Sequence, residues 1–357
     1  MGNLKFYRDE PLFGLDIGYS SMKAMQIESA PGKPLTVIGY GTSTFEPAAI
    51  ENGVIVKPHL IAEAMHNLFE KSLTGAITSR RVACALPTSR TFSRPMKLPP
   101  MDHEAITEAI HLEAEQYIPI PLTNLYLDYE ITHQDPQGIE LLLVAASKSI
   151  IDSYHKTFEA LELEPVVFEP SINAASRIVQ MEGVSGSEPA IIVDVGSSTT
   201  DIAVFDKTLL VASTINDGGE NITDQICQGL HLTRQQAIDL KNEYGISYSE
   251  RQQRIIDAIK PSLETLTEGI QKSIRYYAER ASNKMGGQIS QIIMVGGGSV
   301  MPGLSQYLSK ELRLPTHILD PWQKIQFGHL AMPSEADRAI FTIAAGEAIV
   351  NPAEALK

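Results

Sequence analysis

The sequence predicts an α/β protein built from two related lobes. Its 357 residues are too many for one small core, and strand-like apolar runs alternate with amphipathic helical stretches in both halves. A strand–turn–strand segment at Gly14–Ile27 matches a second one at Ile192–Phe205. Each reads apolar, Asp, apolar, Gly, any residue, Ser, then Ser or Thr. This duplication indicates two halves that face each other.

The first half opens with three strand-like runs and one helix. Apolar residues fill Leu12–Ile17, Gly18–Ser21 forms a turn, and Met22–Glu28 continues as a second strand. A third run follows at Leu35–Tyr40. After Pro58 in the sequence, apolar side chains recur at helical spacing and predict an amphipathic helix. They are Leu60, Ile61, Ala64, Met65, Leu68 and Phe69.

The stretch 82–164 predicts a compact insertion. It begins with the strand-like sequence VACALP, and Asp102 is suited to cap a helix that runs towards Tyr117. Two strands follow, one that alternates apolar and polar residues over 125–131 and one that is apolar throughout 141–146. A last helix is predicted from the face shared by Ile151, Tyr154, Phe158 and Leu161.

The second half repeats the alternation of strands and helices. Two or three helices fill the stretch from Glu220 to Ser282, with a break or kink at Pro261. A final helix is predicted over Ala336–Val350, and Gly183–Ser187 is the candidate hinge. Short strands are predicted at Ala190–Val193, Thr200–Phe205, Leu209–Ile215 and Ile292–Val295.

Composition disfavours several classes of function. The net charge of −14 would repel nucleic-acid phosphates. Cys84 and Cys227 are too few and too far apart for a disulfide framework or a thiolate metal site. Motifs of P-loop ATPases and Ser–His–Asp hydrolases do not occur. The first ten residues lack the apolar core of a signal peptide, and the apolar stretch 339–350 is too short to span a bilayer. We therefore expect a cytoplasmic protein.

Each copy of the duplicated unit is suited to a phosphate group. A tight glycine turn lets backbone N–H groups converge on an anion, and the neighbouring hydroxyls add donors. Asp16 and Asp194 end buried strands and would repel phosphate, so a hard cation such as hydrated Mg²⁺ is expected between these carboxylates and the phosphate. Lys23 supplies a positive charge for the terminal phosphate.

A third glycine-rich segment strengthens this interpretation. Gly296, Gly297 and Gly298 directly follow a buried strand, and a backbone without Cβ atoms can approach a flat ligand such as adenine closely. One Asp-x-Gly-x-Ser turn is common in proteins and is weak evidence for a ligand. Two copies in matched register, together with the triple glycine, are specific evidence for a ligand.

These segments and their order resemble the actin/Hsp70/sugar-kinase superfamily, and within it the branch of bacterial FtsA and PilM proteins. The resemblance covers nearly the whole chain and implies an actin-like ATPase fold, a duplicated ribonuclease H-like architecture of two lobes. It rests on GLDIGYSSMK from Gly14, FEPSINAA from Phe168, VDVGSSTTDIAVF from Val193, NDGGENITDQI from Asn216 and MVGGGSVMPGL from Met294. The implied subdomains are 1A (11–81 and 165–190), the SHS2-like insertion 1C (82–164), 2A (191–217 and 288–357) and 2B (218–287).

The resemblance also implies roles for individual residues. Asp16 and Asp194 would hold hydrated Mg²⁺, and Lys23 would contact the terminal phosphates of ATP. The loops around the nucleotide would comprise Gly18, Ser20 and Ser21, then Gly196, Ser197, Ser198 and Thr199, with Gly218 and Gly219 beside the ribose and Gly296, Gly297 and Gly298 beside the adenine.

Glu169 keeps two interpretations. It falls where the family places the residue that orients the attacking water, which would make it catalytic together with Asp16 and Asp194. The alternative is a glutamate that caps the helix after Pro170.

One position departs from the family. Its helix over the ribose often reads A-E-x-x-K, whereas Ala237–Lys241 reads AIDLK. Ile238 therefore replaces the glutamate while Lys241 is kept, and Asp239 or Gln236 would have to supply the missing acceptor.

As a PilM-like protein, the chain would be a cytoplasmic ATP-binding scaffold of a type IV pilus or related type II-like assembly platform at the inner membrane. Its 1A/1C surface would bind the N-terminal cytoplasmic tail of a PilN-like partner, and ATP would act as a conformational clamp with slow hydrolysis at most. Pilus motor ATPases and a second copy of the chain are further implied partners. The membrane would be reached through a partner, and no nucleic acid is expected.

Two alternatives remain open at this point. An FtsA-like division protein would link filaments to the membrane through a C-terminal amphipathic helix, but the chain ends at NPAEALK without a basic amphipathic segment. A small-molecule kinase of the same superfold would need a catalytic aspartate motif, which we do not find.

Overall fold

The computed structural model describes residues 11–29, 32–183, 188–281 and 288–351, and its first lobe is built on a seven-stranded sheet. The strand order is β11-β7-β1-β2-β3-β17, and β6 pairs with β3. The strands are β1 (Phe13–Ile17), β2 (Ser21–Glu28), β3 (Leu35–Thr44), β6 (Leu73–Gly75), β7 (Arg81–Leu86), β11 (Glu164–Pro170) and β17 (Ile325–Gln326).

The second lobe is built on a five-stranded sheet with the order β14-β13-β12-β15-β16. Its strands are β12 (Ala190–Val195), β13 (Thr200–Asp206), β14 (Thr208–Ile215), β15 (Gln291–Val295) and β16 (Thr316–Ile318). Every strand predicted in this half is present, and β16 is an addition at the edge.

The two sheets repeat one topology. Strands β1, β2 and β3 form an antiparallel meander, as do β12, β13 and β14. In each sheet the first strand of the meander has a parallel neighbour, β7 beside β1 and β15 beside β12. A further parallel strand then follows, β11 in one sheet and β16 in the other. The predicted duplication is confirmed.

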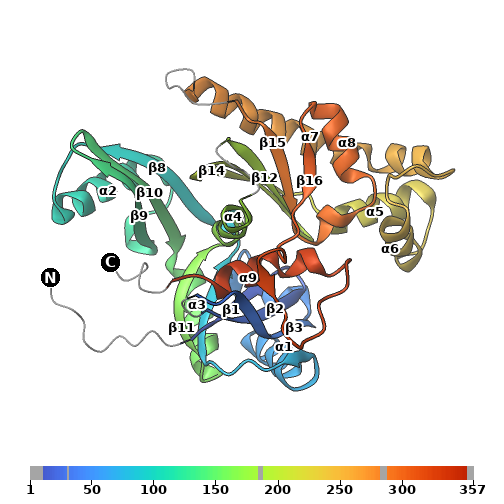
Figure 1. Ribbon diagram of the computed structural model, residues 1–357, viewed down its shortest axis with the longest axis horizontal. Helices are drawn as coiled ribbons and strands as arrows, with labels where there is room; N and C mark the ends of the chain where they lie inside the picture. Colours follow the sequence, from blue (N-terminus) through green and yellow to red (C-terminus); the bar gives the residue numbers. More distant parts are fainter. Residues whose placement is uncertain (1–10, 30–31, 184–187, 282–287, 352–357) are drawn as a thin grey trace.

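Two helices, α4 (Ser171–Glu182) and α9 (Thr342–Ala348), lie between the sheets (Figure 1). Helix α4 connects β11 of the first sheet to β12 of the second. Apolar residues of both helices and both sheets form one continuous core. Glycines allow this close packing. A Cβ at Gly346 of α9 would collide with the Ala174 carbonyl of α4, and a Cβ at Gly14 of β1 would collide with the Ala344 carbonyl of α9. The lobes are thus joined through a shared core.

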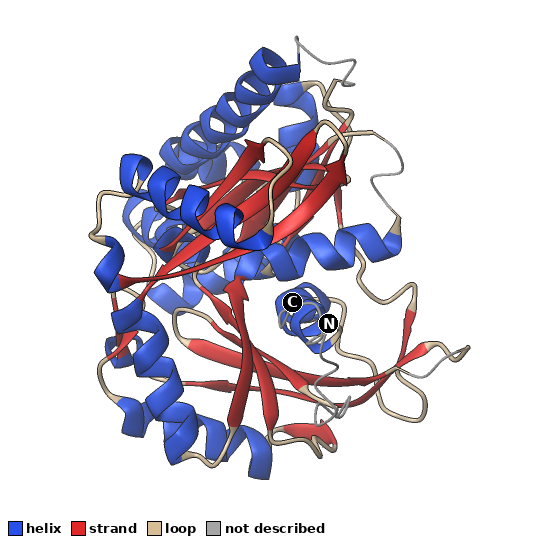
Figure 2. Cartoon of the chain, turned by 90° about the vertical axis from the view of Figure 1, so that its left-hand side faces the viewer, coloured by secondary structure: helices blue, strands red, loops and turns tan. Residues whose placement is uncertain are grey.

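Further helices cover the outer faces of the sheets (Figures 1 and 2). Helices α1 (Pro58–Lys71) and α3 (Lys148–Ala160) pack on the first sheet. The second sheet is covered by α5 (Gly219–Leu230), α6 (Arg234–Glu243), α7 (Gln252–Ala281) and α8 (Leu304–Leu312).

The break expected at Pro261 does not occur, because α7 continues through this proline. An internal proline costs a helix about 3 kcal/mol. Here the buried face of Ile255, Ile259, Leu263 and Ile270 runs past the proline and packs against the second sheet. That continuous apolar contact outweighs the local cost.

A separate three-stranded antiparallel sheet projects from the first lobe. Its order is β8-β10-β9, with β8 (Thr91–Leu98), β9 (Leu125–Asp135) and β10 (Gly138–Ser147). Helix α2 (His103–Tyr117) covers one face, and the predicted cap is confirmed: Asp102 Oδ1 accepts from the Ala105 N–H at 3.0 Å. This unit spans 91–147, inside the expected 82–164, while β7 and α3 pack with the first lobe.

Several short elements complete the fold. The final helix, expected over 336–350, is a 3₁₀ turn followed by α9. Gly183 ends α4 with a φ of 68°, and the rest of the expected hinge, 184–187, lies outside the described residues. The short elements are the hairpin strands β4 (Ile50–Glu51) and β5 (Val54–Ile55), and the 3₁₀ turns η1 (Pro47–Ala49), η2 (Thr88–Arg90), η3 (Leu122–Asn124), η4 (Gly297–Val300) and η5 (Arg338–Phe341).

Candidate functional site

A cleft of about 970 Å³ lies between the two sheets, lined by the turns of the duplicated unit. The two turns share one geometry. The Gly18 N–H donates to the Ser21 carbonyl, and the Gly196 N–H donates to the Thr199 carbonyl, at 2.9 Å in both cases. Two equivalent hairpin turns therefore face one cavity from opposite lobes.

Most of the predicted site residues line this cleft. They are Asp16, Gly18, Ser21, Lys23, Asp194, Gly196, Ser197, Ser198, Thr199, Gly219, Lys241, Gly296, Gly297 and Gly298. Ser20, Gly218 and Glu169 are not part of its lining. The Ser20 carbonyl accepts from the Phe45 N–H, and Gly218 lies behind the second turn, where a Cβ would come within 2.6 Å of the Ser197 carbonyl oxygen.

Negative charge is concentrated at the base of the cleft. Asp16 forms an ion pair with Lys23, with 3.3 Å between Oδ2 and Nζ. Asp194 is half-buried, and its pKa is raised to about 7 by desolvation first and then by the carboxylates of Asp201 and Asp16, although Lys23 opposes the rise. Without a bound cation, the Asp194 carboxyl group is therefore partly protonated near neutral pH.

Asp201 is a cleft residue that sequence reasoning missed. It lies directly opposite Asp194 in the β12–β13 pairing and lines the same cavity. Burial raises its pKa to about 6, and hydrogen bonds with Thr214 and Thr88 oppose this rise. Thr88 belongs to η2 of the first lobe and also lines the cleft, so the hydroxyl that lowers the pKa of Asp201 comes from the opposite lobe. The available signal was a lone acidic residue in the otherwise apolar strand TDIAVF.

The donor set fits a hydrated divalent cation. The carboxylates of Asp201 and Asp16 raise the pKa of Asp194, and Lys23, which is paired with Asp16, opposes this rise. Mg²⁺ keeps several waters and needs one or two carboxylates. A cluster of three direct ligands is thus not required, and none is found among the described residues.

On the opposite side of the cleft, Lys241 connects α6 to the start of α5. Its Nζ donates to the Gly219 carbonyl at 2.9 Å and to Thr223 Oγ1 at 2.8 Å. Burial lowers the pKa of Lys241, and Arg234 lowers it further. The first backbone N–H groups of α5, which begins at Gly219, lie beside this lysine, and a helix N-terminus favours anions.

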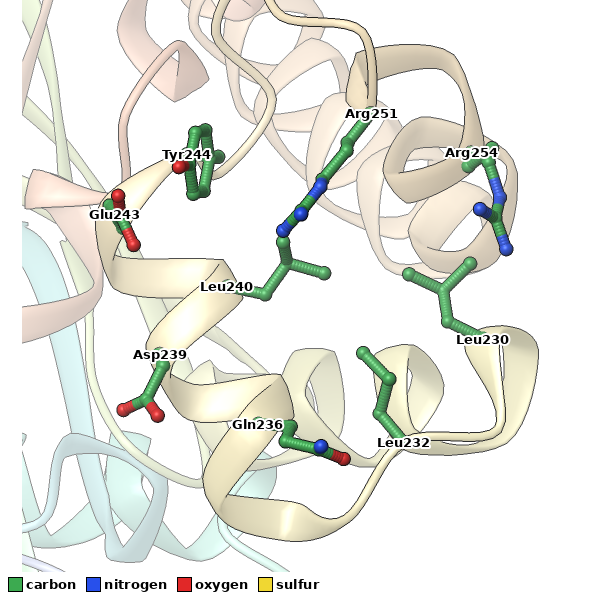
Figure 3. A pocket seen from close by; sticks show the side chains of 9 residues that line it. All are labelled: Leu230, Leu232, Gln236, Asp239, Leu240, Glu243, Tyr244, Arg251 and Arg254. Atoms are coloured by element: carbon green, nitrogen blue, oxygen red, sulfur yellow. The ribbon is translucent and has the colours of Figure 1, made fainter.

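The other face of α6 lines a separate hollow of about 440 Å³ (Figure 3). Gln236 lies there and forms a capping box with Thr233, and Asp239 lies there too. The expectation that Gln236 or Asp239 supplies the missing acceptor is therefore wrong. The helical period turns both away from the cleft, to which α5 and α6 instead bring Glu220 and Asn242.

The triple glycine allows β15 to end against β12. Gly296 has a φ of 81°, and a Cβ there would collide with Oδ1 of Asp194. Across from it, a Cβ at Gly297 would lie 3.0 Å from Cγ2 of Ile340 in η5. Glycine at these positions keeps a narrow space open between η4 and η5.

Glu169 lies outside the cleft lining and pairs with an arginine. Its two oxygens accept from the Arg177 guanidinium at 2.7 and 2.9 Å, and Arg177 also donates to the Gly346 carbonyl. Helix α4 has no side-chain cap, so the capping interpretation is wrong. Glu169 instead ties β11 to α4, whereas Asp201 lines the cleft together with Asp16 and Asp194.

Sequence comparisons agree with this architecture. A sequence model of the type IV pilus assembly protein PilM family matches residues 14–351. The cell division protein FtsA of Streptococcus pneumoniae serotype 2 is 24% identical over 336 residues, which covers 82% of this chain and 71% of that protein. FtsA of Pseudomonas aeruginosa is 22% identical over 359 residues, with 87% and 83% covered.

Solved structures show the same fold. The chain superimposes on a chain of a PilM–PilN type IV pilus biogenesis complex with a TM-score of 0.81, at 22% identity and with 96% and 98% of the two chains covered. MreB 5 of Spiroplasma citri bound to AMPPNP gives a TM-score of 0.55 at 13% identity, with 95% of each chain covered. The fold is therefore actin-like, as the sequence predicts. None of the helices in the described ranges has the length and apolar character needed to cross a membrane.

Proposed function

This chain belongs to the family of the type IV pilus assembly protein PilM, and we propose that it is a cytoplasmic, ATP-binding scaffold of a pilus assembly platform at the inner membrane. The observation that carries the nucleotide part is the pair of equivalent turns, around Asp16 and Asp194, on opposite walls of one cleft. An FtsA-like role is not favoured, because the FtsA relatives are only distantly similar.

In this proposal, the two turns hold the phosphates of ATP and the aspartates hold hydrated Mg²⁺. Backbone N–H groups of both turns suit an anion, and Lys23 adds a positive charge. Lys241 with Gly218 and Gly219 would border the ribose, and the triple glycine the adenine. We keep the division into four subdomains as part of the proposal, with 1C reduced to 91–147 because β7 and α3 pack with the first lobe.

Nucleotide binding would close the lobes on each other. Thr88 supports this because its hydroxyl lowers the pKa of Asp201 from the opposite lobe and lies 2.9 Å from Ser171 Oγ at the start of α4. Thr91, at the start of β8, also donates to the Thr88 carbonyl. A change at the cleft would thus reach the insertion sheet through a few bonds. Asp201, with a pKa near neutral, is the candidate to orient water if ATP is hydrolysed.

The insertion sheet is the proposed partner surface. Among the described residues, ten large apolar side chains are exposed, and half of them belong to this unit: Phe92, Leu112, Tyr117, Tyr126 and Ile131. This concentration of exposed apolar side chains in one small unit is the reason to place a protein contact there. We propose that it binds the N-terminal cytoplasmic segment of a PilN-like protein and so attaches the chain to the membrane.

Nucleotide binding is tested by thermal unfolding with and without Mg·AMP-PNP. Ligand that binds the folded state alone raises the melting temperature. We expect this rise for the wild type and for the control Asp239→Ala on the far face of α6, and its loss in Asp194→Ala and Lys23→Ala. An equal rise in all four proteins would refute the site.

Partner binding is tested with a synthetic N-terminal peptide of a PilN-type protein from the same genome. Tyr126 stands between the insertion and α3, since its hydroxyl donates to Asp152 and Lys148 lies over its ring. We expect Tyr126→Ala to weaken peptide binding, and Tyr248→Ala, which removes an exposed tyrosine of the other lobe, to leave it unchanged. Equal affinity in both variants would exclude this surface.

A further inference from the structure

A small hairpin at the cleft wall holds an arginine that none of the predicted roles uses. Strands β4 and β5 join through Asn52 and Gly53, both with positive φ (51° and 85°), which is the conformation of a two-residue hairpin turn. Asn52, Gly53 and Arg90 all line the cleft. The backbone of the hairpin is fixed to α3, because the Ile55 N–H donates to Ser153 Oγ at 3.1 Å.

The hairpin tip positions the arginine side chain. Oδ1 of Asn52 accepts from a terminal nitrogen of Arg90 at 3.0 Å. The arginine stem passes over the tip, where a Cβ on Gly53 would lie 3.0 Å from Cγ of Arg90. A glycine is therefore needed at 53 both for its φ and for this contact.

Arg90 carries a positive charge, and in the part of the chain that the structure describes no carboxylate forms an ion pair with it. Within the described residues, three basic side chains line the cleft. Lys23 is paired with Asp16, and Lys241 donates to two oxygens of α5. Arg90, in contrast, has a neutral amide as its hydrogen-bond partner and is exposed.

The topology places Arg90 beside the first phosphate turn. Strands β1 and β7 are parallel, with Asp16 opposite Ala85, so the ends of both strands meet at the same edge of the sheet. The turn 18–20 follows β1 there, and η2 with Arg90 follows β7. On its other side η2 packs against β14 of the second lobe. The turn η2, from which the Arg90 side chain extends to Asn52, thus lies where the two lobes meet.

We propose that Arg90 contacts the terminal phosphate of a bound nucleoside triphosphate, and that Asn52 is its positioning residue. This rests on the proposed nucleotide binding in the same cleft. A planar guanidinium suits phosphate oxygens, and a cation at this edge of the cleft would distinguish a triphosphate from a diphosphate. The hairpin β4–β5 would then orient the Arg90 guanidinium towards that phosphate.

The test measures the affinities of Mg·AMP-PNP and Mg·ADP by calorimetry. Arg90→Ala should weaken AMP-PNP binding about tenfold or more, as for a lost charge-assisted hydrogen bond, with ADP changed less than about twofold. Arg90→Gln keeps a hydrogen-bond donor for Asn52 but removes the charge, and it should change both affinities as Arg90→Ala does. Asn52→Ala should lose part of the preference for AMP-PNP over ADP. Arg80→Ala, at an exposed arginine paired with Glu162, is the matched control.

The outcomes separate the two proposals. If the wild type binds AMP-PNP and the Arg90 variants bind it equally well, or lose both nucleotides alike, the role of Arg90 is wrong while nucleotide binding stands. If the folded wild type binds neither nucleotide, the proposed function fails and the role of Arg90 with it. A loss confined to the triphosphate supports the inference.

Discussion

Asp194→Asn removes the carboxyl group whose ionisation the fold opposes most clearly in the cleft. The pKa of Asp194 rises from 3.8 to about 7, which corresponds to about 4 kcal/mol of ionisation cost, since one pKa unit is about 1.4 kcal/mol. The folded state holds this proton more tightly than the unfolded state. The contribution of the protonated Asp194 carboxyl to the free energy of unfolding is therefore fully present below pH 3.8 and is lost as the pH rises to about 7.

The experiment follows urea unfolding in the absence of nucleotide and Mg²⁺ between pH 5 and pH 8. Trp322 is the one tryptophan of the chain and is buried against Phe327 in the core that both lobes share, so its fluorescence reports on unfolding. Over this range the wild type should lose about 3 kcal/mol more than Asp194→Asn, because the linkage slope is about 1.4 kcal/mol per pH unit up to pH 7. At pH 8 the variant should be the more stable protein.

Asp239→Asn provides the matched control, because it makes the same chemical change at an exposed position outside the cleft. It should follow the wild type at every pH. If Asp194→Asn also loses stability in parallel with the wild type from pH 5 to pH 8, Asp194 does not hold a proton in the folded state, and the argument that the cleft needs a cation loses its electrostatic basis.

Three further substitutions test the surroundings of the cleft and the core beside it. Gly296→Ala puts a Cβ against Asp194 and a side chain on a residue with positive φ; urea unfolding should show a loss of about 2 kcal/mol or more, and Mg·AMP-PNP should no longer raise the melting temperature. Glu347→Gln should change stability by less than about 1 kcal/mol, because burial raises the pKa of Glu347 and so disfavours its charged form, and glutamine has nearly the same shape without that charge. Arg177→Met, in contrast, leaves Glu169 without its ion pair and should cost about 3 kcal/mol or more.

Most of the fold could be predicted because local patterns determine it. The hairpins around Gly18 and Gly196 follow from apolar runs that flank a short glycine turn. The cap at Asp102 is a signal confined to four residues. The duplication then relates the two lobes, so that Asp16 and Asp194 could be expected to face one cavity before any contact between them was known.

The elements that sequence reasoning missed depend on contacts between distant parts of the chain. Strand β8 carries polar and charged residues and has no clear alternation, and it is a strand because β10 pairs with it along eight residues. The sequence favours a break at Pro261, but packing on the second sheet keeps α7 continuous. In both cases tertiary contact overrides the local preference.

The same reasoning explains what the sequence could not state about the site. The motif around Glu169 left two interpretations open and did not indicate that Arg177, eight positions later, binds both of its oxygens. Asp201 looked like one more polar residue in a strand. It becomes a cleft residue because pairing sets it opposite Asp194 and because Thr88, more than a hundred residues earlier, reaches it from the other lobe. A carboxylate's role follows from the partner that the fold gives it, and a sequence motif does not state that partner.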